Sequence, residues 1–209
     1  MKFNPDCRSC LRLTNYLQRI KQEYPDYHCA PVDSFGSVTY RLLIVGLAPG
    51  LHGANRTGRP FTGDASGDLL FETMFGLGLA SAKKSISIND GLSLRDCRIT
   101  NAVRCLPPQN KPTSHELKMC SRYLRDDIGE LDAGGVMVAL GRQAHDSILK
   151  VLGVKAKEAP FAHAAEHELG NRLLIDSYHC SRYNTQTRRL TPAMFEAVFE
   201  TAKQRLASR

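Results

Sequence analysis

A strand that runs directly into a long glycine-rich loop constrains this sequence more than any other feature. Residues 40–45 are mostly apolar or β-branched, and no turn residue occurs before Gly46, which predicts a buried strand. From Gly46 to Gly63 the chain carries five glycines and two prolines, and glycine lets a ligand approach the backbone closely. A helix is predicted next, with Ser66 as its N-cap. Because amides at a helix N-terminus hold anions, this arrangement predicts a binding site.

Three further strands are predicted along the chain, with helices between them. The strands cover residues 97–103, 136–140 and 171–178. Four strands with intervening helices predict a parallel sheet covered by helices on both faces. A length of 209 residues suits one domain over residues 1–209. The helices are predicted over residues 4–23, after the capping box Thr113–Glu116, from Gly141 to about Leu152, and after Thr191–Pro192.

Segments rich in chemically active side chains follow three of the predicted strands. They cover residues 46–64, 101–105 and 179–190. Ligands of parallel α/β sheets bind beyond the carboxyl ends of the strands. The three segments are therefore expected to converge on one site.

Charge and cysteine content favour an anionic partner and a reducing compartment. The formal net charge is +7, which fits nucleic acid, although charge alone leaves a protein without nucleic-acid binding equally open. No apolar run approaches the ~20 residues of a membrane span, and residues 1–5 lack the apolar core of a signal peptide. We therefore expect a cytoplasmic protein with no membrane partner. In that compartment the seven cysteines favour metal or cluster ligation over disulfides.

Four of the cysteines are spaced as metal ligands. Cys7 and Cys10 form a C-x2-C pair on the first predicted helix, Cys105 follows the second strand, and Cys120 lies in the next helix. Four thiolates can hold Zn²⁺ or a [4Fe–4S] cluster. The spacing alone leaves zinc, a cluster and no metal open.

Two runs of residues resemble the motifs of a known enzyme family. GLAPG, HG and NRTGRPFTGDASG, in that order within residues 46–67, resemble motif 1 of the uracil-DNA glycosylase superfamily, in the form found in family 5 (type B). The run from His179 to Thr191 resembles motif 2 of that family. It departs from the motif at Tyr183, where glutamine is common, and at Arg188, where glycine is common.

The resemblance implies a fold, an activity and a cofactor. The fold is the three-layer α/β/α sandwich of that superfamily, around a short four-stranded parallel sheet. The activity is that of a monofunctional DNA glycosylase, which removes uracil from DNA, and also hypoxanthine, xanthine or other deaminated bases, to start base-excision repair. We expect a monomer that acts on DNA. The cofactor is a structural [4Fe–4S] cluster, which pins the N-terminal helix to the DNA-binding side through Cys7, Cys10, Cys105 and Cys120.

Cleavage of an N-glycosidic bond needs groups at both ends of that bond, because the sugar becomes cationic while the base leaves as an anion. Asp64, the only carboxylate within residues 46–67, is the candidate for orienting water, with a helix cap or turn as its structural alternative. The resemblance assigns His179 to the leaving base, although a histidine at a strand end can be an ordinary hydrogen-bonded residue. Asn101 would read the base edge with its amide, or simply close its strand.

The flipped base itself needs a stacking partner and backbone contacts. The resemblance implies that Phe61 stacks on the base, and core packing is the alternative. Ala48 stands where families 1 and 4 carry an acid or amide, which is compatible with a less discriminating pocket. The backbone expected to contact the base is that of Gly46, Leu47, Ala48, Pro49 and Gly50.

Basic residues in the two motif loops predict contacts to the DNA backbone, with a solvated loop as the alternative. Leu190 is the expected wedge in the minor groove. The other expected contacts are Arg56, Arg59, Ser181, Arg182, Arg188 and Arg189.

Two other functions fit parts of the sequence. One is a non-catalytic iron–sulfur DNA-binding protein of the same fold, and the other is a small-nucleotide hydrolase that uses the glycine-rich loop for phosphates. Residues 163–167 also fit the HxxEH pattern of inverted zinc peptidases. That segment is short, follows Pro160 and runs into Gly170, so a surface turn is expected there instead.

Overall fold

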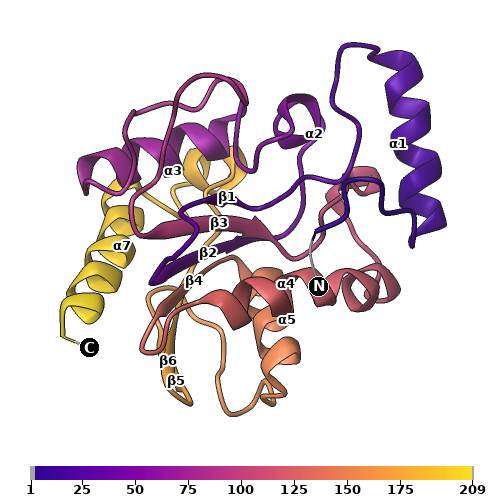
Figure 1. Cartoon of the computed structure of the whole chain (residues 1–209). Helices are drawn as coiled ribbons and strands as arrows, with labels where there is room; N and C mark the ends of the chain where they lie inside the picture. Colours follow the sequence, from indigo (N-terminus) through magenta and orange to yellow (C-terminus); the bar gives the residue numbers. More distant parts are fainter. Residues whose placement is uncertain (1–2, 209) are drawn as a thin grey trace.

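The computed structural model describes residues 3–208 and contains one mixed sheet with helices on both faces (Figure 1). The six strands lie in the order β1-β3-β2-β4-β6-β5. The four central strands are parallel, which confirms the predicted parallel sheet. Their bounds are β2 Leu42–Gly46, β3 Cys97–Asn101, β4 Val136–Leu140 and β6 Arg172–Ser177.

Two edge strands were not predicted, and both pair antiparallel with the central sheet. Strand β1, Phe35–Gly36, has only two residues, too few to form a hydrophobic pattern. Strand β5, Glu166–Leu169, carries alternating exposed and half-buried side chains of mostly polar type. It includes the second half of the HxxEH segment, so the predicted surface turn is wrong for Glu166 and His167. Local polarity hid this strand because an edge strand has one face in water.

The helices form two outer layers, which confirms the three-layer α/β/α class. Helices α3 and α7 pack on one face of the sheet, and α4 and α5 pack on the other (Figure 1). The short helices α2 and α6 lie in the two motif loops. The helices span α1 Leu11–Glu23, α2 Ala54–Thr57, α3 Ala65–Gly76, α4 Ser114–Glu130, α5 Arg142–Leu152, α6 Arg182–Gln186 and α7 Pro192–Ala207, with a short 3-10 turn at Pro108–Asn110.

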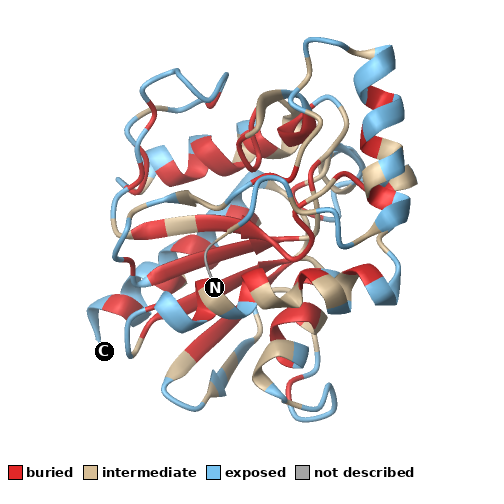
Figure 2. Ribbon diagram, turned by 45° about the vertical axis from the view of Figure 1, so that its right-hand side comes forward, coloured by how far each residue is buried: buried red, intermediate tan, exposed pale blue. Residues whose placement is uncertain are grey.

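The central strands are buried on both faces, as Figure 2 shows. In β2, Leu42 and Ile44 contribute to the core under α3 and α7, while Leu43 and Val45 contribute to the core under α4 and α5. A strand covered on both faces reads as a continuous apolar run, because neither set of side chains meets water. This is why the central strands were recognisable from sequence alone.

Two predicted helix starts are wrong. Helix α1 begins at Leu11, so Cys7 lies before it and Cys10 is its N-cap residue. Residues 4–7 form a turn instead, in which the Asn4 side chain accepts from the amide of Asp6; such local bonds compete with helix formation. Helix α3 is capped by Asp64 rather than Ser66.

Two other predicted helix starts are confirmed. Thr113 and Glu116 form a reciprocal capping box at the start of α4. Thr191 caps α7, with Pro192 in the first turn. Within residues 3–208, none of the helices combines the length and apolar character needed to cross a membrane.

Candidate active site

A cavity of about 330 Å³ lies beyond the carboxyl ends of the parallel strands. It is lined by residues from all three segments that were predicted to converge, and also by Ser66 and Asn110, which lie outside those segments. Alignment of the strand ends explains this convergence, since Gly46 of β2 is in register with Asn101 of β3. The lining residues are Leu47, Ala48, Gly50, Ala54, Phe61, Asp64, Ser66, Asn101, Asn110, His179 and Ser181.

Gly46 and Pro49 do not line the cavity, although both were expected to contact the base. Pro49 is buried away from it. Gly46 lies behind it, where a Cβ would stand 2.4 Å from Asn101 Oδ1 and 2.6 Å from Phe61 Cζ. Glycine at position 46 therefore allows the Asn101 amide and the Phe61 ring to meet at the cavity wall.

Asn101 ends β3 with its side chain buried, 3% exposed. Its Oδ1 has no hydrogen-bond partner within the described chain. A buried polar atom without a partner costs about 1–3 kcal/mol, so this oxygen indicates a position where a ligand completes the hydrogen bonding.

Phe61, expected to stack on the base or to pack in the core, is 7% exposed and belongs to the core on the α3 side. Its backbone has φ +53°, a left-handed conformation that a bulky residue rarely adopts. In this conformation the ring lies on the cavity wall, with its centre 6.2 Å from that of the His179 ring. Phe61 therefore packs in the core and also lines the cavity.

Asp64 divides its carboxylate between two tasks. Oδ1 accepts from the amides of Ser66 and Gly67, each at 3.0 Å, and so caps α3. Oδ2 lies against Gly50 and Gly53, where a Cβ would stand 3.3 Å and 2.1 Å away. The capping alternative is thus correct for one oxygen, while the residue also lines the cavity.

His179 lies two residues after β6 and reaches the same cavity. Burial lowers its pKa below the ordinary value, and the Asp64 charge opposes that shift only in part. Its ring nitrogens make no hydrogen bond to other groups of the described chain, whereas its carbonyl accepts from Asn184 Nδ2 at 2.8 Å. A neutral imidazole held by its backbone is thus available to a ligand.

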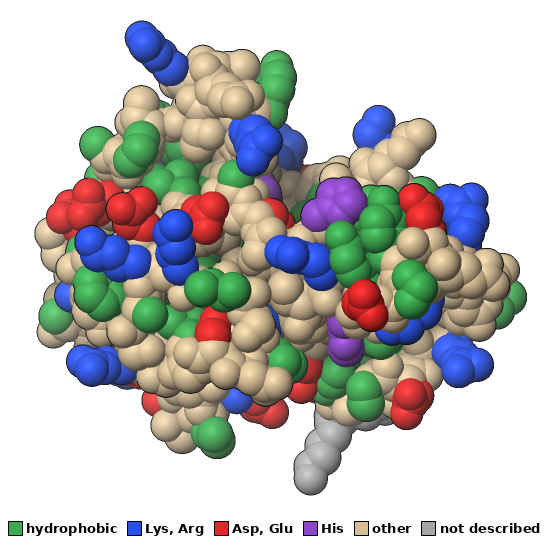
Figure 3. All heavy atoms as spheres, turned by 90° about the horizontal axis from the view of Figure 1, so that it is seen from above, with side chains coloured by type: hydrophobic (Ala, Val, Ile, Leu, Met, Phe, Trp, Pro, Cys, Tyr) green, Lys and Arg blue, Asp and Glu red, His purple; other side chains and the backbone are tan. Residues whose placement is uncertain are grey.

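Four of the predicted DNA contacts are exposed and belong to the two motif loops that contribute residues to this cavity: Arg56, Arg182, Arg188 and Arg189. Arg56 is held to the loop by its bonds to the carbonyls of His52 and Gly63. Arg189 lies over the Tyr178 ring at 4.6 Å. Seen from above, basic side chains alternate with acidic ones rather than forming one basic patch on that face (Figure 3).

Arg59 and Leu190 are interior residues, which contradicts the DNA contacts expected of them. Arg59 is 3% exposed; its Nη1 pairs with Asp90 at 2.7 Å and donates to Ser85 at 2.9 Å, and its Nη2 donates to the Ile88 carbonyl at 2.8 Å. It therefore ties the motif loop to residues 85–90. Leu190 is 0% exposed and belongs to the core under α3 and α7, so it is not an exposed wedge.

Sequence reasoning missed Asn110, which lines this cavity, and gave no role to Tyr183. Tyr183, in α6, is 71% exposed, two residues after Ser181, which caps α6 and lines the cavity. An aromatic residue directly after Arg182 in this basic loop was the available signal. Asn110 follows Pro107 and Pro108 with φ +55°, a conformation that asparagine tolerates better than most residues.

Comparison with known proteins decides the family. The model of the uracil-DNA glycosylase superfamily matches residues 34–203. The chain belongs to this superfamily. A Type-5 uracil-DNA glycosylase of Thermus thermophilus is 45% identical over 204 residues, which is 95% of this chain and 93% of that protein. One of Pyrobaculum aerophilum is 40% identical over 201 residues, which is 94% of this chain and 88% of that protein.

A solved structure supports the fold alone. The crystal structure of wild-type SMUG2 from Pedobacter heparinus aligns with a TM-score of 0.51 at 15% identity, over 93% of this chain and 85% of that chain. Even at this low identity, this chain and the Pedobacter heparinus protein share the same overall fold.

Four free cysteines of this superfamily member line one small second cavity: Cys7, Cys10, Cys105 and Cys120. Burial, and then the other three thiols that line this cavity, raise the pKa of Cys105. Burial opposes ionisation of Cys7, but hydrogen bonds with Ser9, Tyr123 and Arg122 outweigh it and lower the pKa to about 7. The predicted convergence of the four thiols is therefore present, with two of them in the segment before α1 rather than on it.

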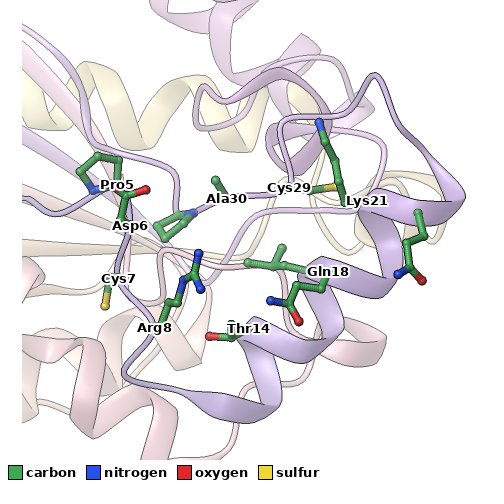
Figure 4. Close-up of a pocket in the computed structure, with 12 residues that line it drawn as sticks. Pro5, Asp6, Cys7, Arg8, Thr14, Gln18, Lys21, Cys29 and Ala30 are labelled. Carbon is green, nitrogen blue, oxygen red and sulfur yellow. The ribbon is translucent and has the colours of Figure 1, made fainter.

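A third cavity, of about 400 Å³, adjoins the cysteine site between α1 and residues 5–8 and 29–31 (Figure 4). Cys7 and Cys29 lie at opposite ends of it, with Arg8 between them. It shares Cys7, Thr14 and Pro31 with the cysteine cavity, but no lining residue with the cavity that holds Asp64 and His179.

Proposed function

We propose that this protein hydrolyses the N-glycosidic bond of uracil in DNA and thereby starts base-excision repair. Relatives called Type-5 uracil-DNA glycosylase support the reaction at 40–45% identity over almost the whole chain. The observation that carries it is one cavity in which Asp64, Asn101, Phe61 and His179 meet. Hypoxanthine, xanthine and other deaminated bases are further proposed substrates, because Ala48 places no charged or amide group on the cavity wall.

In this proposal Asp64 acts at the sugar. Its Oδ2 is not used in capping α3, so it can accept a proton or a hydrogen bond from the attacking water and oppose the positive charge on the sugar. Because Oδ1 is fixed by two amides, the carboxylate has a defined orientation before substrate arrives. The reaction is monofunctional, with water rather than a lysine as the nucleophile.

Asn101 and His179 act at the base. The unpaired Asn101 oxygen accepts a hydrogen bond from the base edge, while its amide group donates one. A neutral His179 donates a hydrogen bond to the base oxygen on which negative charge develops. Phe61 contacts the base face, and the backbone of residues 47–50 completes the wall.

The exposed arginines around the cavity form the proposed DNA-binding rim: Arg56, Arg182, Arg188 and Arg189. Ser181 lines the cavity and directly precedes Arg182, and it would contact the phosphate of the flipped nucleotide. Tyr183 takes the role expected of Leu190, because it is an exposed aromatic side chain in the same loop and can enter the base stack. A base inside a duplex must be flipped out of the stack before the enzyme can reach its N-glycosidic bond.

We also propose that the four clustered cysteines hold a [4Fe–4S] cluster. In a tetrahedral zinc site the sulfurs lie about 3.8 Å apart, as bonds of ~2.3 Å require. Among the described residues, no three of these cysteine sulfurs lie within 4.8 Å of one another. The sulfurs are therefore spread more widely than ligands of a single ion. The Arg122 guanidinium, 3.1 Å from Cys7 Sγ, would offset negative charge. The cluster would be structural and tie the N-terminal segment to β3 and α4.

Incubation with a uracil-containing oligonucleotide, followed by alkali, tests the proposal. Strand cleavage at the uracil position is expected from wild-type protein and is absent for a non-catalytic DNA-binding protein of this fold. Phosphate release from free nucleotides would favour the small-nucleotide hydrolase instead. About four irons per chain are expected after anaerobic purification, and stoichiometric zinc without iron would contradict the cluster. The protein is further proposed to act as a monomer in the cytoplasm, where free thiols persist.

A further inference from the structure

Three side chains outside the cavity and the cysteine site form a buried cluster of metal-ligand type. His145 comes from α5, His167 from β5 and Asp176 from β6, and one ligand atom of each lies within 4.8 Å of the others. His145 is 1% exposed, Asp176 is 0% exposed and His167 is 11% exposed. Three segments that are far apart in sequence thus bring two imidazoles and one carboxylate to one enclosed point.

With Asp176 ionised, the two hydrogen bonds of His145 require a positive charge between its ring and the Asp176 carboxylate. Its Nε2 lies 3.0 Å from the carbonyl oxygen of Ala159, and its Nδ1 lies 2.7 Å from Asp176 Oδ1. A neutral imidazole has one donor and one acceptor nitrogen, yet both nitrogens here face oxygens that accept. With Asp176 ionised, either a proton or a metal cation must occupy the Nδ1 side.

The buried Asp176 carboxylate also requires a positive charge beside it. Asp176 Oδ2 faces His167 Nε2 at 3.2 Å, and within residues 3–208 its ion-pair partners are the two histidines, with no lysine or arginine among them. A buried carboxylate is stable only when a cation or a set of donors offsets the loss of water. Two imidazoles and a carboxylate are a ligand set that zinc prefers, with a fourth position open.

We propose that His145 Nδ1, His167 Nε2 and Asp176 bind a divalent transition-metal ion of the zinc type. The Nε2–Ala159 hydrogen bond is the second contact that metal-bound histidines usually make, to a backbone carbonyl. The 3.2 Å between His167 Nε2 and Asp176 Oδ2 matches the ~3.3 Å edge of a tetrahedron with ~2.0 Å bonds. His145 and Asp176 must separate slightly, as the ion replaces the shared proton.

This site uses only one histidine of the HxxEH segment. His163 Nδ1 accepts from the amide of Tyr178, and its ring stacks on the Tyr178 ring at 5.0 Å. Glu166 pairs with Arg205 at 2.7 Å. The segment is therefore not a peptidase motif, and His167 ligates with residues that the pattern does not contain.

Cobalt binding to the full-length protein tests the site. Titration with Co²⁺ should give visible d–d bands for one ion per chain, without the sulfur-to-cobalt charge-transfer band that thiolate ligation produces. Zn²⁺ should remove these bands and raise the midpoint of thermal unfolding by several degrees. Neither readout depends on glycosylase activity, so failure here leaves the proposed function intact.

His167→Ala is the decisive variant, because His167 lies on a short edge strand and is the least buried ligand. It should lose the cobalt bands and the zinc-dependent stabilisation, and Asp176→Asn should do the same. His115→Ala, at an exposed position in α4, is the matched control and should keep both. Cobalt bands unchanged in His167→Ala would overturn the site. So would wild-type protein that takes up no metal, which would leave a protonated His145–Asp176 pair as the whole explanation.

Discussion

Gly53 and Asp64 are in such close contact that a Cβ at position 53 would lie 2.1 Å from Asp64 Oδ2. The absence of a side chain at Gly53 therefore sets the position of the oxygen proposed to orient water. This makes a residue with no functional group part of the catalytic geometry.

Gly53→Ala should displace the Asp64 carboxylate and slow uracil release. We expect a loss of about 10²-fold in the single-turnover rate, the size of effect seen when one electrostatic group is removed, with DNA affinity retained. Gly76→Ala is the control, because a Cβ there meets nothing within 4 Å. Equal rates for the two variants would separate Gly53 from catalysis.

Substitution of Asp64 can distinguish its two tasks. Asp64→Asn keeps an oxygen that can cap α3 but loses the charge, so stability should change little while base release slows by about 10²–10³-fold. Asp64→Ala should show the same loss of rate and also lose about 1 kcal/mol of stability with the cap. Urea unfolding and single-turnover assays on both variants measure this. A wild-type rate for Asp64→Asn would show that another group activates water.

Arg59 and Arg188 should respond in opposite ways to substitution. Arg59→Ala leaves Asp90 without its buried partner, and should cost about 3–5 kcal/mol of unfolding free energy. Arg188 is exposed and has φ +56°, so Arg188→Gly should keep or raise stability. It should also reduce the slope of log affinity against log salt by about 1 if Arg188 contacts a phosphate. An unchanged slope would place Arg188 off the DNA.

Substitutions of Leu190 and Tyr183 should have different effects, on stability in the first case and on capture of the flipped base in the second. Leu190→Ala removes a fully buried side chain and should destabilise the protein by about 2–5 kcal/mol. Tyr183→Ala removes a side chain that is 71% exposed, and should leave stability within about 0.5 kcal/mol while weakening capture of the flipped base. Thermal unfolding and binding to uracil-containing duplex report the two effects. Normal capture by Tyr183→Ala would overturn the proposed entry of Tyr183 into the base stack.

The pH profile should report a neutral His179. Its folded pKa lies below the ordinary 6.5, chiefly through burial. The neutral donor therefore persists at all working pH values above this lowered pKa, and the single-turnover rate should fall only when pH drops below it. The unfolded chain binds this proton more readily, so the stability contributed by this group is lost as pH falls below 6.5. A single-turnover rate that decreases as pH rises above 6.5 would contradict a neutral donor. His115→Ala, which removes an exposed histidine, should show the same decrease in that case.

The sequence by itself determined the central architecture and the location of the site. Strands β2 and β4 are buried on both faces, so their residues are apolar in continuous runs and are recognisable without any partner. Parallel strands align their carboxyl ends, and that rule alone brought Asp64, Asn101 and His179 together. The capping box marked α4, and Thr191 with Pro192 marked α7, because these signals act within one turn of the chain.

Only the tertiary structure decided which side of each loop faces water. Arg59 and Arg188 are both arginines in motif loops, yet one is buried against Asp90 and the other is exposed. In the second motif loop, Leu190 is buried although it was expected to be exposed, and Tyr183 is the exposed side chain instead. In a loop no periodic pattern of 2 or 3.6 residues links sequence to burial. The same holds for His145, His167 and Asp176, whose contact depends on packing between segments that no local pattern relates.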